Sequence, residues 1–205
     1  MLMSGVSLVD WRPEMLAATV DLLARAFAKN PLHVAAFGKD SVLEKNRAFF
    51  QAGLSTFRGH RLVAVEGARI IGFIHWVESP GCRFSWKQRA RLVPVMLRKF
   101  GPGATLRLSA WISAWAKNDS NDAHWHVGPI GVDPDVQGKG IGRRMMEACC
   151  TALLDNAANG VLETDKPENV RFYEKFEFAV VKEIQVIGVK TFFMARSHTA
   201  RNKDC

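Results

Sequence analysis

A glycine-rich segment in the second half of the chain has the composition of an anion-binding loop. It reads Val-Asp-Pro-Asp-Val-Gln-Gly-Lys-Gly-Ile-Gly over residues 132–142, between a stretch typical of a strand and one typical of a helix. Gly138, Gly140 and Gly142 carry no side chains, so a ligand can approach the backbone closely. The unpaired N–H groups of the first helical turn and the helix dipole favour negative charge there. We therefore expect this loop to bind a pyrophosphate group.

Two common phosphate-binding patterns do not fit the loop. The dinucleotide-binding pattern Gly-x-Gly-x-x-Gly requires glycine where the chain has Arg143, and the P-loop requires lysine where Ile141 follows Gly140. The pattern that matches is Gln-x-x-Gly-x-Gly, preceded by Val-Asp-Pro on a strand. With this pattern the chain resembles the GNAT superfamily of acyl-CoA-dependent N-acyltransferases.

A second segment strengthens the resemblance. Residues 162–176, Leu-Glu-Thr-Asp-Lys-Pro-Glu-Asn-Val-Arg-Phe-Tyr-Glu-Lys-Phe, are similar to the second conserved block of the superfamily. Together with Trp-His-Val-Gly-Pro-Ile-Gly-Val-Asp-Pro over residues 125–134, this block looks most like the branch that contains puromycin N-acetyltransferase. Clear matches cover about residues 125–178. The resemblance implies a mixed, mostly antiparallel central sheet flanked by helices, an α/β (α+β) fold, and acetyl-CoA as cosubstrate.

The resemblance also implies how the chain would hold acetyl-CoA. The strand end at residues 130–132 would pair with the pantetheine arm, and backbone N–H groups of residues 137–142 would hold the pyrophosphate. Lys139 and Arg143 would add positive charge beside it, and the alternative is that both belong to a solvated helix face. The implied cosubstrate-binding residues are Ile130, Gly131, Val132, Gln137, Gly138, Lys139, Gly140, Ile141, Gly142, Arg143, Asn169 and Tyr173.

Tyr173, the only tyrosine of the chain, matches the superfamily position that protonates the departing CoA thiolate. A phenol with a pKa of about 10 can donate to a thiolate whose conjugate acid has a pKa of about 8.5. Tyr173 could instead be a packing aromatic beside Phe172 and Phe176. Asn169, one helical turn earlier, matches a position that contacts CoA, but its amide could also cap the helix or face water.

The attacking amine must lose a proton, because an alkylammonium group has a pKa of about 10. Glu163 and His126 are the candidate proton acceptors, since each lies on an expected strand that could pass the acyl group. Either could equally be a structural carboxylate or histidine. His124 shares a strand face with His126, but two ligands without a third make a poor metal site, so we expect no metal.

Hydrophobic periodicity predicts the elements that position these residues. Helices are expected after Pro13, ending before Pro31, and after Asp40, followed by a hairpin over residues 61–78. A helical insert at about residues 84–117 is expected to break at Gly101-Pro102-Gly103, and to pack on the core or form a lid. The elements expected after it are a strand over 124–132, a helix over 140–156, a strand over 161–164, a helix over 167–176 and a hairpin over 178–196.

The composition limits the classes of protein that the chain can belong to. With 205 residues and 48% hydrophobic content, one domain over residues 1–205 is expected, with the CoA-binding core at about 124–178. The apolar runs are too short to cross a bilayer and no signal peptide is recognised, so we expect a cytoplasmic protein without a membrane partner. The net charge of +8 favours an anionic partner, such as a polyphosphate cosubstrate or nucleic acid.

We therefore predict an N-acetyltransferase that transfers an acetyl group from acetyl-CoA to a primary amine by direct attack in a ternary complex. Cys149 and Cys150 have no recognisable base motif, so no acyl-enzyme is expected. One alternative is a non-catalytic CoA-binding sensor or scaffold, which would not need Tyr173. Another is an acyltransferase acting on an RNA-linked amine, but nucleic acid is the weaker partner because no RNA-reading pattern of basic and aromatic residues occurs. No motif indicates the acceptor or the oligomeric state.

One residue departs from the pattern of the superfamily. The helix ending near Phe176 is usually followed by Gly-Phe, whereas here Glu177 precedes Phe178. A non-glycine residue in a left-handed helix cap costs about 1 kcal/mol. We therefore expect Glu177→Gly to raise the melting temperature, provided that this cap is left-handed.

Overall fold

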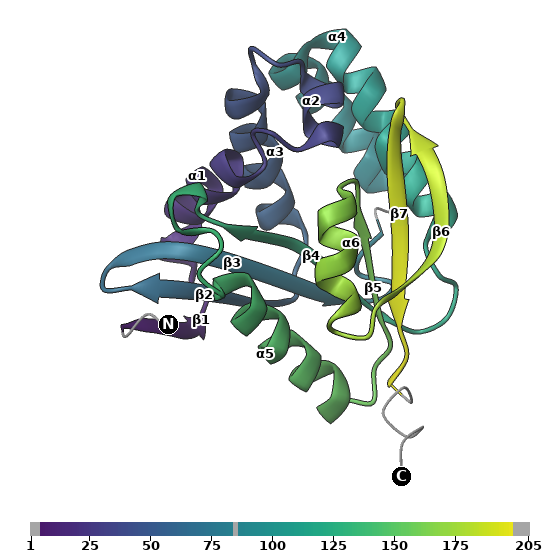
Figure 1. Ribbon diagram of the computed structural model, residues 1–205. Helices are drawn as coiled ribbons and strands as arrows, with labels where there is room; N and C mark the ends of the chain where they lie inside the picture. Colours follow the sequence, from purple (N-terminus) through teal and green to yellow (C-terminus); the bar gives the residue numbers. More distant parts are fainter. Residues whose placement is uncertain (1–4, 84–85, 199–205) are drawn as a thin grey trace.

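The fold is a single mixed sheet with helices on both faces (Figure 1). The structure is a computed structural model that describes residues 5–83 and 86–198. The seven strands lie in the order β1-β2-β3-β4-β5-β7-β6, and all neighbours are antiparallel except β4 and β5. This confirms the predicted mostly antiparallel sheet. The strands are β1 (Val6–Asp10), β2 (His60–Glu66), β3 (Arg69–Glu78), β4 (Trp125–Val132), β5 (Gly160–Thr164), β6 (Ala179–Val186) and β7 (Val189–Arg196).

Six α-helices accompany the sheet in the described part of the chain. They are α1 (Leu16–Ala26), α2 (Pro31–Phe37), α3 (Val42–Thr56), α4 (Trp86–Asn118), α5 (Ile141–Asp155) and α6 (Pro167–Glu174). Helix α2 was not among the sequence predictions, which read Pro31 only as the end of the preceding helix. It begins there because Asn30 caps it, its side-chain oxygen accepting from the N–H of His33 at 3.0 Å, and Pro31 occupies the first turn.

Side-chain alternation along the strands separates two hydrophobic layers. On β2, Val63 packs with α1 and α3, while its neighbour Ala64 packs on the opposite face with α5. Amphipathic helices cover each face because α1 and α5 both repeat apolar residues at helical spacing. The sheet is therefore buried on both sides near β3 and β4, where the candidate site residues begin.

The predicted insert forms α4, which breaks where the sequence indicated. Gly101 has φ 77° and ψ 167°, so it leaves the helical conformation, while the residues on either side continue as helix. Positions 84 and 85 of the predicted insert lie outside the described residues. Its buried residues, among them Met96, Phe100 and Trp111, pack with Phe37 of α2 and with Val186 of the closing hairpin. In Figure 1, α2, α3 and α4 lie together at the top of the view.

The parallel strands β4 and β5 pair only at their first residues and then diverge. Only Trp125 with Gly160 and His126 with Val161 are in register, although β4 continues to Val132. The edge of β4 that would face β5 is therefore unpaired from Val127 onward, so a gap opens in the middle of the sheet.

Candidate active site

A cavity of about 300 Å³ lies where β4 and β5 diverge. One part of its wall is apolar and comes mainly from α2, α3 and α4, and the other part is polar and comes from β4, β5 and α6. The cavity brings together five of the residues singled out from the sequence. They are His126, Ile130, Glu163, Asn169 and Tyr173.

His126 and Glu163 form a pair at the bottom of this gap. The Nε2 atom of His126 lies 3.0 Å from Oε2 of Glu163, and the two side chains are 17% and 4% exposed. Burial lowers the pKa of His126, but the adjacent charge and hydrogen bond of Glu163 outweigh it, so that the pKa is raised from its ordinary value. The sequence proposed these two residues separately, and the structure brings them into contact because β4 and β5 are adjacent strands and Glu163 lies two residues beyond Val161, the register partner of His126.

Tyr173 and Asn169 enter the cavity from α6. Tyr173 is 6% exposed and its ring packs edge-on against Phe172 and Phe178. Burial raises the pKa of Tyr173, so the phenol keeps its proton at neutral pH. The amide of Asn169 neither caps the helix nor faces only water, since its Nδ2 donates to Oγ1 of Thr164 at 3.2 Å.

The glycine-rich loop has the backbone geometry of an anion site. Gly138 and Gly140 have φ of 79° and 81°, in the left-handed region, and no heavy atom lies within 4 Å of a Cβ built on either residue. Glycine is needed there for backbone conformation rather than for space. The side chain of Gln137 closes the loop, with its Nε2 donating to the carbonyl oxygen of Val132 at 3.0 Å. Among the described residues, the N–H groups of residues 140–143 donate to no protein acceptor.

The other residues predicted at the loop take different positions. Lys139 is exposed, and Arg143 is an exposed member of an ion pair with Glu147, at 2.8 Å between Nε and Oε1. Ile141 points into the core, so only its backbone can face a ligand. Gly131 is required by packing, because a Cβ there would lie 2.7 Å from Cδ2 of Leu23 on α1.

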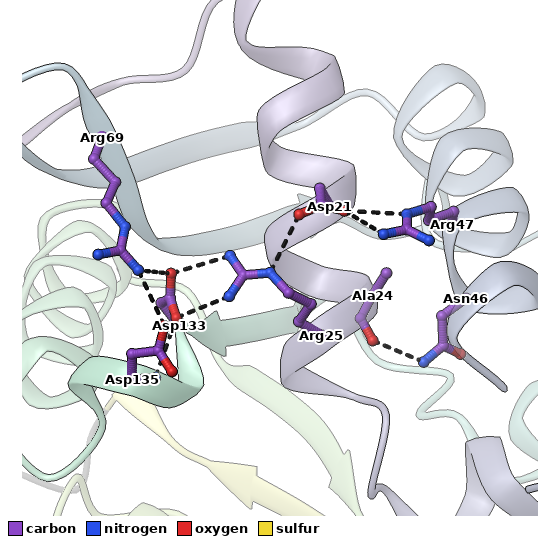
Figure 2. Close-up of polar contacts among 8 residues, drawn as sticks. All are labelled: Asp21, Ala24, Arg25, Asn46, Arg47, Arg69, Asp133 and Asp135. Carbon is purple, nitrogen blue, oxygen red and sulfur yellow. Dashed lines mark hydrogen bonds and ion pairs between the residues drawn. The ribbon is translucent and has the colours of Figure 1, made fainter.

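Asp133, between β4 and the loop, is a buried centre of ion pairs that the sequence did not reveal (Figure 2). Both of its oxygens accept from Arg25 of α1 at 3.0 Å, and Oδ2 also accepts from Arg69 of β3 at 2.7 Å. These hydrogen bonds, with Arg25 contributing most, lower the pKa of Asp133 to about 2. Asp133 therefore fixes the end of β4 relative to α1 and β3.

A second, half-buried carboxylate organises the other side of the cavity. Oδ1 of Asp165 accepts from Nδ2 of Asn30, and Oδ2 accepts from the N–H of Leu32, each at 2.7 Å. These bonds join the start of α2 to the end of β5. The only sequence signal for this contact was the position of Asp165 inside the conserved block.

The comparisons with known proteins agree with this geometry. A sequence model of the acetyltransferase (GNAT) family matches residues 28–178, so the chain belongs to that family. It is an acyl-CoA-dependent N-acetyltransferase, and acetyl-CoA is the cosubstrate of the family. The prediction from the two sequence blocks is confirmed at this level, while the puromycin branch stays a prediction.

Solved structures share the fold at low sequence identity. One is described as histone acetyltransferase HPA2 and related acetyltransferase from Corynebacterium glutamicum, with a TM-score of 0.73, 17% identity, and coverage of 95% of this chain and 97% of that chain. Arylalkylamine N-acetyltransferase 2 from Aedes aegypti has a TM-score of 0.68, 16% identity, and coverage of 95% and 100%. A GNAT acetyltransferase from Brucella melitensis in complex with acetyl-CoA has a TM-score of 0.52, 16% identity, and coverage of 94% and 87%. Within residues 5–83 and 86–198, no helix is both long and apolar enough to cross a membrane.

Proposed function

We propose that this enzyme transfers the acetyl group of acetyl-CoA to a primary amine attached to a large apolar or aromatic body, by direct attack in a ternary complex. The observation that carries this proposal is the single cavity in which Tyr173 and the pair of His126 and Glu163 share one space with an aromatic wall. The open edge of β4 leads from this cavity toward the glycine-rich loop.

The residues around β4 fit acetyl-CoA. The unpaired edge near Ile130 offers backbone groups to the amides of the pantetheine arm, as a neighbouring strand would. The free N–H groups at the start of α5 suit the pyrophosphate. Lys139 stays a candidate for an added phosphate contact, and Arg143 would have to leave Glu147 to provide one. The remaining predicted binding residues, Gly131 and Val132, contribute through the strand backbone.

The acid and base roles follow from position. His126, oriented by Glu163, accepts the proton of the amine, and the nitrogen then forms its bond to the acetyl carbon. As the carbon–sulfur bond breaks, the Tyr173 hydroxyl gives its proton to the sulfur. A covalent acyl-enzyme is disfavoured because Cys149 is fully buried and burial raises the pKa of its thiol.

The wall of the cavity supports an apolar acceptor. Phe49 stacks on Trp111, with ring centroids 5.6 Å apart, and Trp115 lies beside His126 at 6.4 Å. His33 adds to this wall as a neutral ring, because burial lowers its pKa to about 4. The Nε1 atoms of Trp111 and Trp115 are buried, so these two rings add no exposed polar atom to the wall.

The test compares amines and variants in one assay that detects CoA thiol release. We expect 2-phenylethylamine and tyramine to give higher kcat/KM than spermidine and agmatine. Tyr173→Phe is expected to lower kcat about 100-fold or more while changing the dissociation constant of acetyl-CoA only a few-fold. Unchanged kcat in this variant would reject the acid role, and a preference for spermidine would reject the apolar acceptor.

A matched pair of variants tests whether the aromatic wall of the cavity binds the amine substrate. Trp115→Leu should raise KM for the aromatic amine and leave that for acetyl-CoA unchanged. Leu106→Ala, on the same helix but 73% exposed and away from the cavity lining, should change neither. Equal effects of the two substitutions would contradict the assignment of the wall.

A further inference from the structure

Four side chains that can ligate metal ions gather beside the cavity. Cys82, Asp119, His124 and His126 each offer one ligand atom, and these atoms all lie within 4.8 Å of one another. They come from the turn after β3, the segment after α4, and β4 with the residue that precedes it. The expectation of no metal rested on the lack of a third ligand beside the two histidines, and the fold supplies Cys82 and Asp119.

The orientation of His124 leaves its Nε2 directed into the cluster. Its Nδ1 lies 2.7 Å from the carbonyl oxygen of Asp122, so Nδ1 carries the proton of the neutral ring and donates it. Nε2 then presents a lone pair to Asp119, with Oδ1 3.1 Å away. Metal-binding histidines are typically oriented in this way, by a hydrogen bond from the second ring nitrogen.

When the ring proton of His124 is on Nδ1, its Nε2 atom and Oδ1 of Asp119 are both hydrogen-bond acceptors. Their close contact therefore requires a positive charge between them. Oδ1 of Asp119 is buried and has no hydrogen-bond partner among the described residues, although Nε2 of His124 lies so close. A cation bound at this point would supply that charge. The metal-free cluster is an ion-pair network, and the same atoms suit a cation with directional bonds.

Two of the distances among the three ligand atoms are close to the edges of a zinc tetrahedron. The Sγ atom of Cys82 lies 3.8 Å from Nε2 of His124, and Nε2 lies 3.1 Å from Oδ1 of Asp119. Bonds of about 2.3 Å to sulfur and about 2.0 Å to nitrogen or oxygen give edges of about 3.5 Å and 3.3 Å. These two distances therefore differ from the expected edges by only a few tenths of an ångström.

The second oxygen of Asp119 already has an outer partner. Oδ2 accepts from Nε of Arg83 at 2.5 Å, which leaves Oδ1 directed toward His124. Ligating carboxylates are held in this manner by hydrogen bonds to their other oxygen. His126 stays with Glu163 at 3.0 Å, so it lies next to the cluster without being required as a ligand.

We infer that Cys82, Asp119 and His124 form a binding site for a single divalent ion of the zinc class, with the fourth position open toward the cavity. A thiolate, an imidazole and a carboxylate are the ligand types that zinc accepts. The site joins the chain before α4 to the chain after it. The ion therefore fastens both ends of the insert to the start of β4.

The first experiment measures metal directly in the full chain, purified without chelator. We expect about one zinc per chain by plasma mass spectrometry. Cobalt(II) added to the metal-free protein should give the near-ultraviolet absorption of a thiolate–cobalt bond. Zinc should also raise the melting temperature, and a chelator should reverse this rise. A chain without retained zinc, without the cobalt absorption and without the thermal shift would overturn the site and leave only the ion-pair network.

Variants then identify the thiolate. Cys82→Ser should abolish the cobalt–thiolate absorption and weaken zinc binding at least tenfold. Cys150→Ser, a control on α5 away from the cluster, should keep both. Retention of the absorption in Cys82→Ser would refute the assignment. If this variant does not fold, protection of one thiol of the wild-type chain from a thiol reagent by zinc tests the same bond, and equal labelling with and without zinc would refute it.

Discussion

Glu163 on β5 lies 3.0 Å from His126 on β4, two residues beyond Val161, the last residue of β5 that is in register with β4. A carboxylate in this place orients the imidazole and stabilises its protonated form. The pair therefore lies at the bottom of the gap through which an amine and a thioester would meet.

This relationship predicts different effects of two substitutions. His126→Gln removes the proton acceptor, so kcat should fall about 100-fold or more, within the range usual for general bases. Glu163→Gln keeps a hydrogen-bonding side chain and should lower kcat less, leaving KM for acetyl-CoA nearly unchanged. Steady-state kinetics with saturating acetyl-CoA measures both. If His126→Gln keeps most of its turnover, another group or a water molecule takes the proton.

The left-handed backbone of Gly140 predicts a coupled loss of stability and cosubstrate binding. Gly140→Ala places a Cβ at φ 81°, which costs about 1 to 2 kcal/mol and displaces the start of α5. The melting temperature should fall by a few degrees, and calorimetry should show weaker binding of acetyl-CoA. Gly103→Ala is the matched control, since Gly103 lies in the helical part of α4 and alanine favours a helix there. Equal binding by the two variants would contradict the role of the loop.

The ion pairs of Asp133 predict a pH dependence of stability. Its folded pKa of about 2 is lower than its ordinary value, so the native state gains stability above the ordinary pKa and loses it as the pH falls toward 2. The contribution at neutral pH is about 2 kcal/mol. Urea unfolding between pH 7 and pH 2 should show this loss in the wild type. A slope just as steep in Asp133→Asn would assign the dependence to other carboxylates.

The cap at Glu177 is left-handed, with φ 66°, but the structure reverses the expected effect of glycine on stability. Oε2 of Glu177 accepts from Nη2 of Arg196 at 2.8 Å, and the Arg196 side chain is only 3% exposed. Leaving a buried guanidinium without this partner costs about 1 to 3 kcal/mol or more, which exceeds the gain of about 1 kcal/mol from relieved backbone strain. Glu177→Gly should therefore lower the melting temperature.

The control for this prediction keeps the side-chain acceptor. Glu177→Gln can still accept from Arg196 while retaining the strained backbone, so its melting temperature should lie between those of the wild type and Glu177→Gly. A higher melting temperature for Glu177→Gly than for the wild type would show that backbone strain outweighs the buried ion pair. Thermal unfolding followed by circular dichroism gives all three values.

The features that could be predicted from the sequence are those that depend on residues close together in the chain. The loop around Gly138 and Gly140 and the helix that carries Tyr173 could be predicted because backbone conformation and helix starts depend on neighbouring residues. The cavity could not, because it depends on contacts such as Asn30 with Asp165 and Arg25 with Asp133, which lie 135 and 108 positions apart. Nothing in a local pattern specifies such a pair.

Pro31 and Cys82 are two residues whose roles could not be predicted from the sequence, one because of a neighbouring residue and the other because of residues distant in the chain. Pro31 was read as the end of one helix, whereas the preceding Asn30 makes it the start of another. Cys82 carried no signal as an isolated cysteine, and only the return of the chain after α4 places it beside His124.

Helix α4 is inserted between β3 and β4, which already pair with each other along their length. The sheet does not need the inserted stretch to set its own register. Exchange of this one contiguous segment would therefore alter the part of the cavity wall that α4 forms, while the pairing of β3 with β4 stays in place.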